Sequence, residues 1–95
     1  MNRLNQVLFE GKIGKFELQG NAGKGIVIHE RYFKDSNGNG EIEITEMPFV
    51  VYGRMAEILN DKIDRIIRIV GRLSVVDNSI AIVSEHIEIL FQIPQ

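Results

Sequence analysis

The chain has 95 residues, of which 44% are hydrophobic and 25% charged, and these values are typical of one globular domain spanning residues 1–95. It contains no cysteine, which excludes disulfides, thiolate metal sites and cysteine nucleophiles. No apolar run approaches the roughly 20 residues that span a bilayer, and the N-terminus lacks the apolar segment of a signal peptide. We therefore expect a cytoplasmic protein without a membrane segment.

The formal net charge of −2 hides an uneven distribution along the chain. Residues 1–34 carry six basic and three acidic residues, a balance of +3, whereas residues 35–64 carry two basic and seven acidic residues, a balance of −5. A protein with such a polarised surface can bind anions on one side despite a negative total. The charge pattern therefore permits a nucleic-acid partner without requiring one.

The first half of the chain predicts three strands. Residues 6–16 favour a strand with bulges or bends at Gly11 and Gly14, and residues 19–25 have the composition of a hairpin loop. Residues 25–33 predict a second strand, with one face formed by Ile26, Ile28 and Glu30. After a loop at residues 35–40, residues 41–52 predict a long third strand. Its alternation places three side chains on one face: Ile42, Ile44 and Glu46.

The second half predicts one helix and two strands. Residues 54–61 favour a helix of two turns, whose buried stripe has the spacing i, i+3, i+4 at Met55, Ile58 and Leu59. Residues 66–74 and 79–90 predict the fourth and fifth strands, joined by a tight turn at residues 77–78. Three strands, a helix and two strands follow the order of the OB-fold, an all-β five-stranded Greek-key barrel with its helix between strands three and four. The glycines at positions 11, 14 and 71 suit strands that bend to close a barrel.

Five segments, in the same order, resemble the bacterial single-stranded DNA-binding protein family. They cover most of the chain and comprise Gly11-Lys12-Ile13-Gly14-Lys15, Phe33-Lys34-Asp35, Tyr52-Gly53-Arg54-Met55-Ala56-Glu57, Val70-Gly71-Arg72-Leu73 and residues 83–90. The resemblance implies an OB-fold that binds single-stranded DNA without catalysis, in replication, repair or recombination. By position it implies base stacking on Phe33 and Tyr52, and phosphate contacts from Lys15, Arg31, Lys34, Arg54 and Arg72.

The sequence also departs from the family pattern. It contains no tryptophan, and Glu46 stands where the family usually has a stacking tryptophan. The loop between strands four and five shrinks to about residues 75–79, and the flexible tail with an acidic tip that recruits partners in the family is absent. We therefore expect a smaller footprint and weaker binding. The short, tailless form is also similar to primosomal replication protein N, which bridges other replication-restart proteins.

These departures leave an alternative function open, in which the OB-fold is a protein-interaction adaptor with weak or no binding of nucleic acid. Phe33 and Tyr52 fit cross-strand or core packing as well as base stacking, and Arg54 and Arg72 fit ordinary surface charges. The other phenylalanines are expected in the core or an interface: Phe9, Phe16, Phe49 and Phe91. Family members pair through their first strand, which implies a homodimer or homotetramer. The apolar segment 89–93 suggests a packed C-terminus at a subunit contact.

A third reading comes from residues 35–46, which fit the calcium loop of an EF-hand at every required position from Asp35 to Glu46. The flanks oppose it, because residues 25–28 are poor helix formers and Pro48 follows closely. Asparagine and glycine are also what a hairpin loop selects, and we expect a hairpin loop there.

No pattern in the sequence indicates catalysis. The two histidines, His29 and His86, are each isolated in a predicted strand, and no serine lies in a nucleophile motif. The carboxylates mostly alternate along strands as a solvated face. We therefore expect neither an enzyme nor a cofactor or metal.

Overall fold

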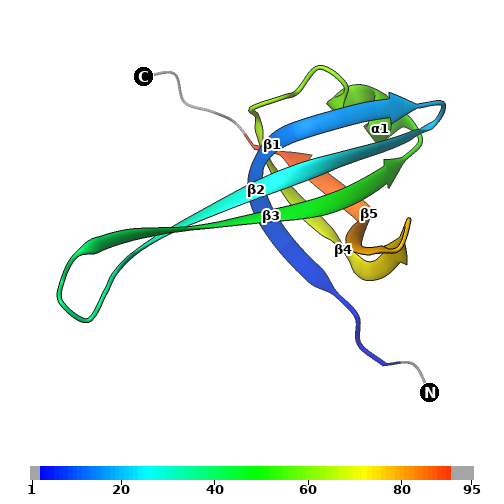
Figure 1. Ribbon diagram of the computed structural model, residues 1–95. Helices are drawn as coiled ribbons and strands as arrows, with labels where there is room; N and C mark the ends of the chain where they lie inside the picture. Colours follow the sequence, from blue (N-terminus) through cyan, green and yellow to red (C-terminus); the bar gives the residue numbers. More distant parts are fainter. Residues whose placement is uncertain (1–2, 91–95) are drawn as a thin grey trace.

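Five strands and one short helix make up the part of the chain described by this computed structural model, residues 3–90 (Figure 1). The elements in chain order are β1 (Val7–Gln19), β2 (Ala22–Lys34), β3 (Gly40–Tyr52), α1 (Arg54–Leu59), β4 (Ile66–Val76) and β5 (Ser79–Ile89). The type and order of every element match the sequence prediction. The strands differ from it mainly in length, since β1 runs three residues further and β2 begins three residues earlier than expected.

The strands close into a barrel in the order β1-β2-β3-β5-β4. The β1–β2, β2–β3, β4–β5 and β1–β4 ladders are antiparallel, and only the short β3–β5 contact is parallel. The helix α1 lies between β3 and β4 in the chain, as the OB-fold requires. The predicted five-stranded barrel is therefore confirmed.

Alternate side chains of every strand fill the barrel. Opposite ladder pairs such as Ile69–Ile87 and Phe49–Ile82 are almost fully buried, because both members of a pair point to the same side of a sheet. The helix adds Ala56 and Leu59 to this interior. The core cluster comprises Ile13, Val27, Phe49, Val51, Ala56, Leu59, Ile67, Ile69, Ile82 and Ile87. Phe9 and Phe16 are partly buried against it, as expected.

The first hairpin has a much shorter turn than the sequence predicted. Only residues 20–21 separate β1 from β2, and Gly23 and Gly25 lie inside the β2 strand. A Cβ at Gly23 would meet the ring of Phe16, and one at Gly25 would meet both the backbone oxygen of Lys15 and the ring of Phe49. These glycines therefore make room for two stacked rings, 6.0 Å apart between centroids, rather than forming a loop.

Strand irregularities at two glycines bend the sheet into the barrel. The β1–β2 register shifts between Ile13 and Lys15, around Gly14, and the β4–β5 register shifts between Val70 and Gly71. Bulges of this kind increase local twist and allow a sheet to curl. The expected role of these glycines in closing the barrel is consistent with both shifts.

Gly53 turns the end of β3 directly into α1. Its φ of 74° lies in the left-handed region that glycine adopts without strain, and its N–H donates to the Asn21 oxygen at 2.7 Å. The helix is shorter than predicted and ends at Leu59. The predicted stripe is also partly wrong, because Ile58 is exposed and Ala56 takes its place in the core. The face of α1 that meets the barrel is centred on Ala56 and Leu59, with Met55 partly buried beside them.

The β2–β3 hairpin continues beyond the barrel as a twisted ribbon (Figure 1). We call residues 30–44 the arm. The strand residues of the arm, 30–34 and 40–44, are all exposed, because no other strand pairs with them. The arm is therefore a projecting two-stranded surface whose side chains are set by the ladder and not by a core.

The expected packing of the C-terminal segment 89–93 lies mainly outside the described residues, since only Ile89 and Leu90 of that segment belong to them. Both are partly buried, and the Leu90 N–H donates to the Ile66 oxygen at 2.9 Å. Within residues 3–90, no helix has both the length and the apolar character needed to cross a membrane.

Candidate nucleic-acid interface

The β2–β3 ladder defines two sides of one continuous ribbon. Directly opposite residues share a side, so the pairs Val27–Met47 and Gly25–Phe49 mark the side that faces the barrel interior. The intervening pairs, Ile26–Pro48 among them, face outward. We call this the outer side. The predicted alternation of Ile26, Ile28 and Glu30 in β2, and of Ile42, Ile44 and Glu46 in β3, is confirmed, and both sets lie on the outer side.

Tyr52 lies on the outer side at the barrel end of β3, opposite Ala22, and is 58% exposed. The interpretation of Tyr52 as a core residue is therefore wrong, because more than half of its surface is exposed.

Phe33 lies on the opposite side of the ribbon from Tyr52. It pairs with Glu41, is 37% exposed, and carries the guanidinium of Arg31 at 5.3 Å from its ring centroid. Arg31 also approaches Glu43 at 3.9 Å. The structure thus brings Phe33 and Arg31 together in a cation–π contact and separates both from Tyr52.

Tyr32 is the aromatic residue of the arm that shares the outer side with Tyr52. It pairs with Ile42, is 70% exposed, and its hydroxyl donates to the Glu30 carboxylate at 3.0 Å. That carboxylate holds the pKa of the phenol above its ordinary value of 10.0. Tyr32 was not among the residues predicted from the sequence, although the alternation that put Ile28 and Glu30 on one face extends to it.

Arg72 lies in a row of outward-facing residues that crosses the barrel. The ladders align Arg72 with Val83, Val83 with Val50, Val50 with Lys24 and Lys24 with Glu17. Arg72 and Lys24 therefore flank a pair of valines on the outside of the barrel. Lys24 was not among the residues predicted from the sequence.

Three other predicted cations lie near this surface. Lys15 pairs with Ile26 on the outer side, Lys34 pairs with Gly40 on the outer side of the arm, and Arg54 begins α1 two residues after Tyr52. Together with Arg72 they are exposed, and among residues 3–90 none of the four makes a salt bridge. Four of the five predicted cations thus remain available to an anionic partner.

The tight β4–β5 turn reaches Lys24 across β3. Asp77 and Asn78 have φ values of 50° and 68°, the pattern of a two-residue hairpin turn with positive φ at both positions. The Asp77 carboxylate accepts a hydrogen bond from the Lys24 ammonium, which raises the pKa of that lysine above its ordinary value of 10.5. Val50, between them in the sheet order, is 4% exposed.

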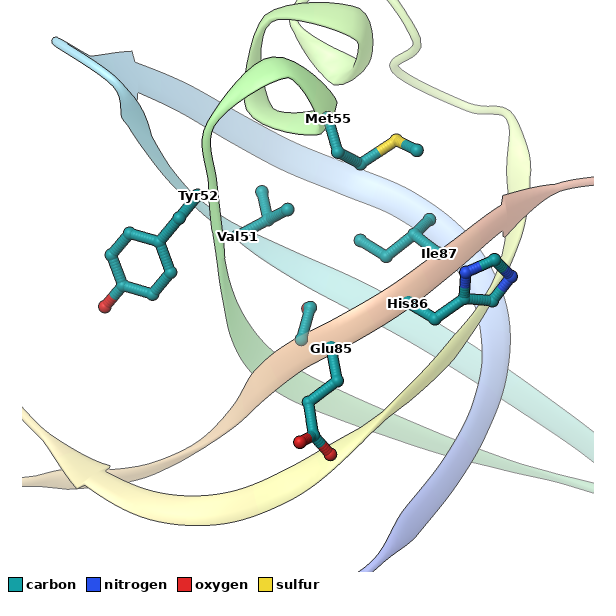
Figure 2. A pocket seen from close by; sticks show the side chains of 7 residues that line it. Val51, Tyr52, Met55, Glu85, His86 and Ile87 are labelled. Carbon is teal, nitrogen blue, oxygen red and sulfur yellow. The ribbon is translucent and has the colours of Figure 1, made fainter.

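A small pocket opens where β3 and β5 part (Figure 2). Their ladder consists of the pairs Phe49–Ile82 and Val50–Val83, so the next residues, Val51 and Ser84, lie beyond it. Figure 2 shows Val51 and Ile87 facing one another below Met55, while the side chains of Tyr52, Glu85 and His86 point away. The pocket is therefore a seam of the barrel where two core residues, Val51 and Ile87, meet exposed residues. The exposed members of its lining are Tyr52, Glu85 and His86.

In the loop that fits the calcium pattern, the first expected ligand, the Asp35 carboxylate, is hydrogen-bonded to backbone N–H groups of the loop itself. The Asp35 carboxylate accepts N–H groups of Asn37 and Asn39 at 2.9 and 2.8 Å. Glu46 lies in β3 opposite Ile28, six residues or about 20 Å of extended strand beyond Gly40. The two ends of the required ligand set do not converge, which contradicts the calcium reading and confirms the hairpin loop.

The two histidines have different surroundings and lie on different strands, His29 on β2 and His86 on β5. His29 Nδ1 lies 2.9 Å from the Glu10 backbone oxygen and its ring meets Phe9 edge-on, whereas His86 is exposed on β5. Across residues 3–90 there is no group of three or more histidine or carboxylate side chains that could hold a metal ion.

No protein-family model matches the sequence, and no curated protein sequence matches it either. Solved structures do match. The single-stranded DNA-binding protein of Plasmodium falciparum in complex with single-stranded DNA superposes with a TM-score of 0.73 at 13% identity, covering 97% of each chain. The protein PriB from Ralstonia solanacearum gives a TM-score of 0.66 at 11% identity and covers 92% of this chain and 98% of its own.

A deletion mutant of the single-stranded DNA-binding protein of Thermus aquaticus is also similar, with a TM-score of 0.70 at 19% identity. The match covers 93% of this chain and 51% of that protein, so the chain spans about half its length. The resemblance expected from the five sequence segments is thus confirmed at the level of the fold. Over nearly its whole length, the chain has the fold of single-stranded DNA-binding proteins and of PriB.

Proposed function

We propose that this protein binds single-stranded DNA without catalysis, along the outer side of β1, β2 and β3. The observation that carries the proposal is the placement of two exposed tyrosines, Tyr32 and Tyr52, on one side of the ribbon. A flat ring with an uncovered face accepts any base, so binding by stacking is tolerant of sequence. The fold likeness to proteins that bind single-stranded DNA supports the same conclusion.

The cations near this side supply the phosphate contacts. Lys15, Lys34, Arg54 and Arg72 are exposed and make no salt bridge within residues 3–90. Each phosphate neutralised on a single strand contributes about −0.7 to the slope of log K against log salt concentration. Four contacts give a slope of about −3.

We further propose that two copies associate through β1, as the sequence resemblance implies. The β1–β4 ladder covers Val7 to Lys12, whereas the β1–β2 ladder begins only at Lys12. One edge of residues 7–11 is therefore not covered by a strand of the described chain, and Leu8 on this segment is 70% exposed. Light scattering coupled to size exclusion tests this, with a dimer or tetramer expected and a monomer at high concentration contradicting it.

A protein-interaction adaptor is the second candidate, and one observation favours it. Ile42 and Ile44 are 56% and 59% exposed on the outer side of the arm, beside Tyr32. Aliphatic side chains offer no ring for stacking but suit an apolar protein surface. In this alternative the arm docks a replication protein and nucleic acid binds weakly or not at all.

Anisotropy of a labelled oligo(dT), titrated with the protein at several salt concentrations, tests the DNA proposal. A duplex of the same length serves as the control, because its bases are not free to stack. Preferential binding of the single strand with a salt slope near −3 is expected. Absence of binding at low salt and high protein concentration would exclude this function and leave the adaptor.

A further inference from the structure

The β4–β5 turn places a carboxylate on the outer side of the ribbon, directly over a cation that faces the proposed DNA path. Lys24 lies on β2 opposite Val50, on the same side as Tyr52. Its ammonium is bound by Asp77, and the two side chains remain 47% and 73% exposed. The pair is therefore open to solvent and to a competing anion.

We propose that Lys24 is a further phosphate-binding residue, and that Asp77 occupies the place of a DNA phosphate until the strand binds. This inference rests on the proposed function and adds a residue to the same site. A carboxylate and a phosphate oxygen are both anionic acceptors for an ammonium. Single-stranded DNA then gains Lys24 only by displacing Asp77.

The position of Lys24 relative to Tyr52 supports its role. Tyr52 lies two residues from Val50 on the same side of β3, so Lys24 and Tyr52 are diagonal neighbours in the ladder. Such neighbours are about 7–8 Å apart, within reach of long side chains. A nucleotide whose base stacks on Tyr52 therefore has its own phosphate close to Lys24.

The geometry of the turn indicates which partner moves. Asp77 and Asn78 form a two-residue turn with the pair Val76–Ser79 directly behind it, so the backbone of Asp77 is held by the β4–β5 ladder. Lys24 carries its ammonium on a flexible four-carbon stem. Rotation of the lysine side chain alone exchanges Asp77 for a phosphate, and the barrel does not need to open.

The exchange adds a small cost to the Lys24 contact. Any phosphate that binds Lys24 must first break the ion pair with Asp77, and an exposed ion pair of this kind is worth little. Asp77 therefore weakens the Lys24 contact modestly without preventing it.

The test compares Asp77→Asn with the wild type by oligo(dT) anisotropy at several salt concentrations. Asparagine tolerates positive φ, so the turn is retained. We expect about 2- to 5-fold tighter binding at about 0.15 M salt, with a slope close to that of the wild type because both proteins make the same phosphate contacts. In a Lys24→Gln background the same substitution must have no effect, since the two residues act as one pair.

The matched control is Glu88→Gln, which changes the net charge equally. Glu88 approaches Arg68 at 3.9 Å, and it lies about 16 Å along β5 from Val83, well beyond a Debye length. Equal effects of Asp77→Asn and Glu88→Gln would overturn the inference, and so would an unchanged affinity of Asp77→Asn or a gain that persists without Lys24.

A second variant keeps the inference testable if Asp77→Asn does not fold. Lys24→Gln alone must weaken binding of oligo(dT) and make the salt slope shallower, and an unchanged slope would refute the role of Lys24. The proposed function fails differently. In that case neither the wild type nor any variant binds the single strand.

Discussion

Tyr32 and Tyr52 lie on the same side of the β2–β3 ribbon, ten ladder positions apart. Tyr32 pairs with Ile42 near the end of the arm, and Tyr52 pairs with Ala22 at the barrel. Ten residues of strand correspond to about 33 Å along a ribbon that twists between the two rings. In the proposed binding mode one single strand of several nucleotides contacts both tyrosines, whereas Phe33 lies on the other side of the ribbon.

The first prediction distinguishes the two aromatic residues of the arm. Tyr32→Ala should weaken oligo(dT) binding by about 1–3 kcal/mol, the cost of losing one stacked base. Phe33→Ala is the matched control and should have a smaller effect, because the Arg31 guanidinium already covers that ring. Anisotropy titrations of both variants check this. A larger loss for Phe33→Ala would show that the strand follows the opposite side.

The second prediction concerns the ionisation of Tyr32. Its neutral hydroxyl donates to the Glu30 carboxylate, and a phenolate would lose that bond and face a like charge, so the pKa is raised above 10.0. The corresponding stabilisation is present below pH 10 and is lost as the pH rises through the higher pKa of the folded state.

Ultraviolet absorbance of tyrosinate measures this ionisation in a Tyr52→Phe background, where Tyr32 is the remaining tyrosine of the sequence. Glu30→Gln should lower the pKa of Tyr32 toward its ordinary value, because the amide oxygen accepts the hydrogen bond without a charge. An unchanged titration curve in Glu30→Gln would show that the contact does not form in solution.

The third prediction concerns the bend of β4. A Cβ on Gly71 would lie 2.2 Å from the backbone oxygen of Val83, so Gly71→Ala should destabilise the fold by about 1–3 kcal/mol. Gly40→Ala is the control. Its Cβ would meet nothing within 4 Å, and its stability should stay within about 0.5 kcal/mol of the wild type. Denaturant unfolding checks both, and equal stabilities would contradict the barrel geometry at Gly71.

The fourth prediction concerns the loop at residues 35–40. The Asp35 carboxylate is bound by the N–H groups of Asn37 and Asn39, and Glu46 lies far along β3. Millimolar calcium should therefore leave the melting temperature unchanged, since only a ligand that binds the folded state raises it. A calcium-dependent increase that disappears in Asp35→Asn would reverse this conclusion.

The fold could be predicted from the sequence because several local signals agree. β-branched alternation, a helix after Gly53 and bends at Gly14 and Gly71 all point to the same barrel. The misassigned turn at Gly23 and Gly25 has a tertiary cause. A glycine in a strand and a glycine in a loop cannot be distinguished by sequence alone. Here the glycines are needed because the rings of Phe16 and Phe49 pack against them in the folded barrel.

The site was less predictable, because adjacent residues of a strand face opposite ways. The resemblance to known proteins implies stacking on both Phe33 and Tyr52, but the ladder puts these two residues on opposite sides of the ribbon and puts the neighbouring Tyr32 on the side of Tyr52. The pairing of Lys24 with Asp77 could not be foreseen, because 53 positions of chain separate them and only the β4–β5 turn brings them together.

Tyrosine fluorescence tests the central claim most directly. The sequence has no tryptophan and two tyrosines, so single variants Tyr32→Phe and Tyr52→Phe each report on the other ring. A base that stacks on a tyrosine quenches it. We predict that oligo(dT) quenches both variants, saturating at the concentration at which anisotropy saturates. Binding without quenching of either tyrosine, or no binding at all, would contradict stacking on the outer side.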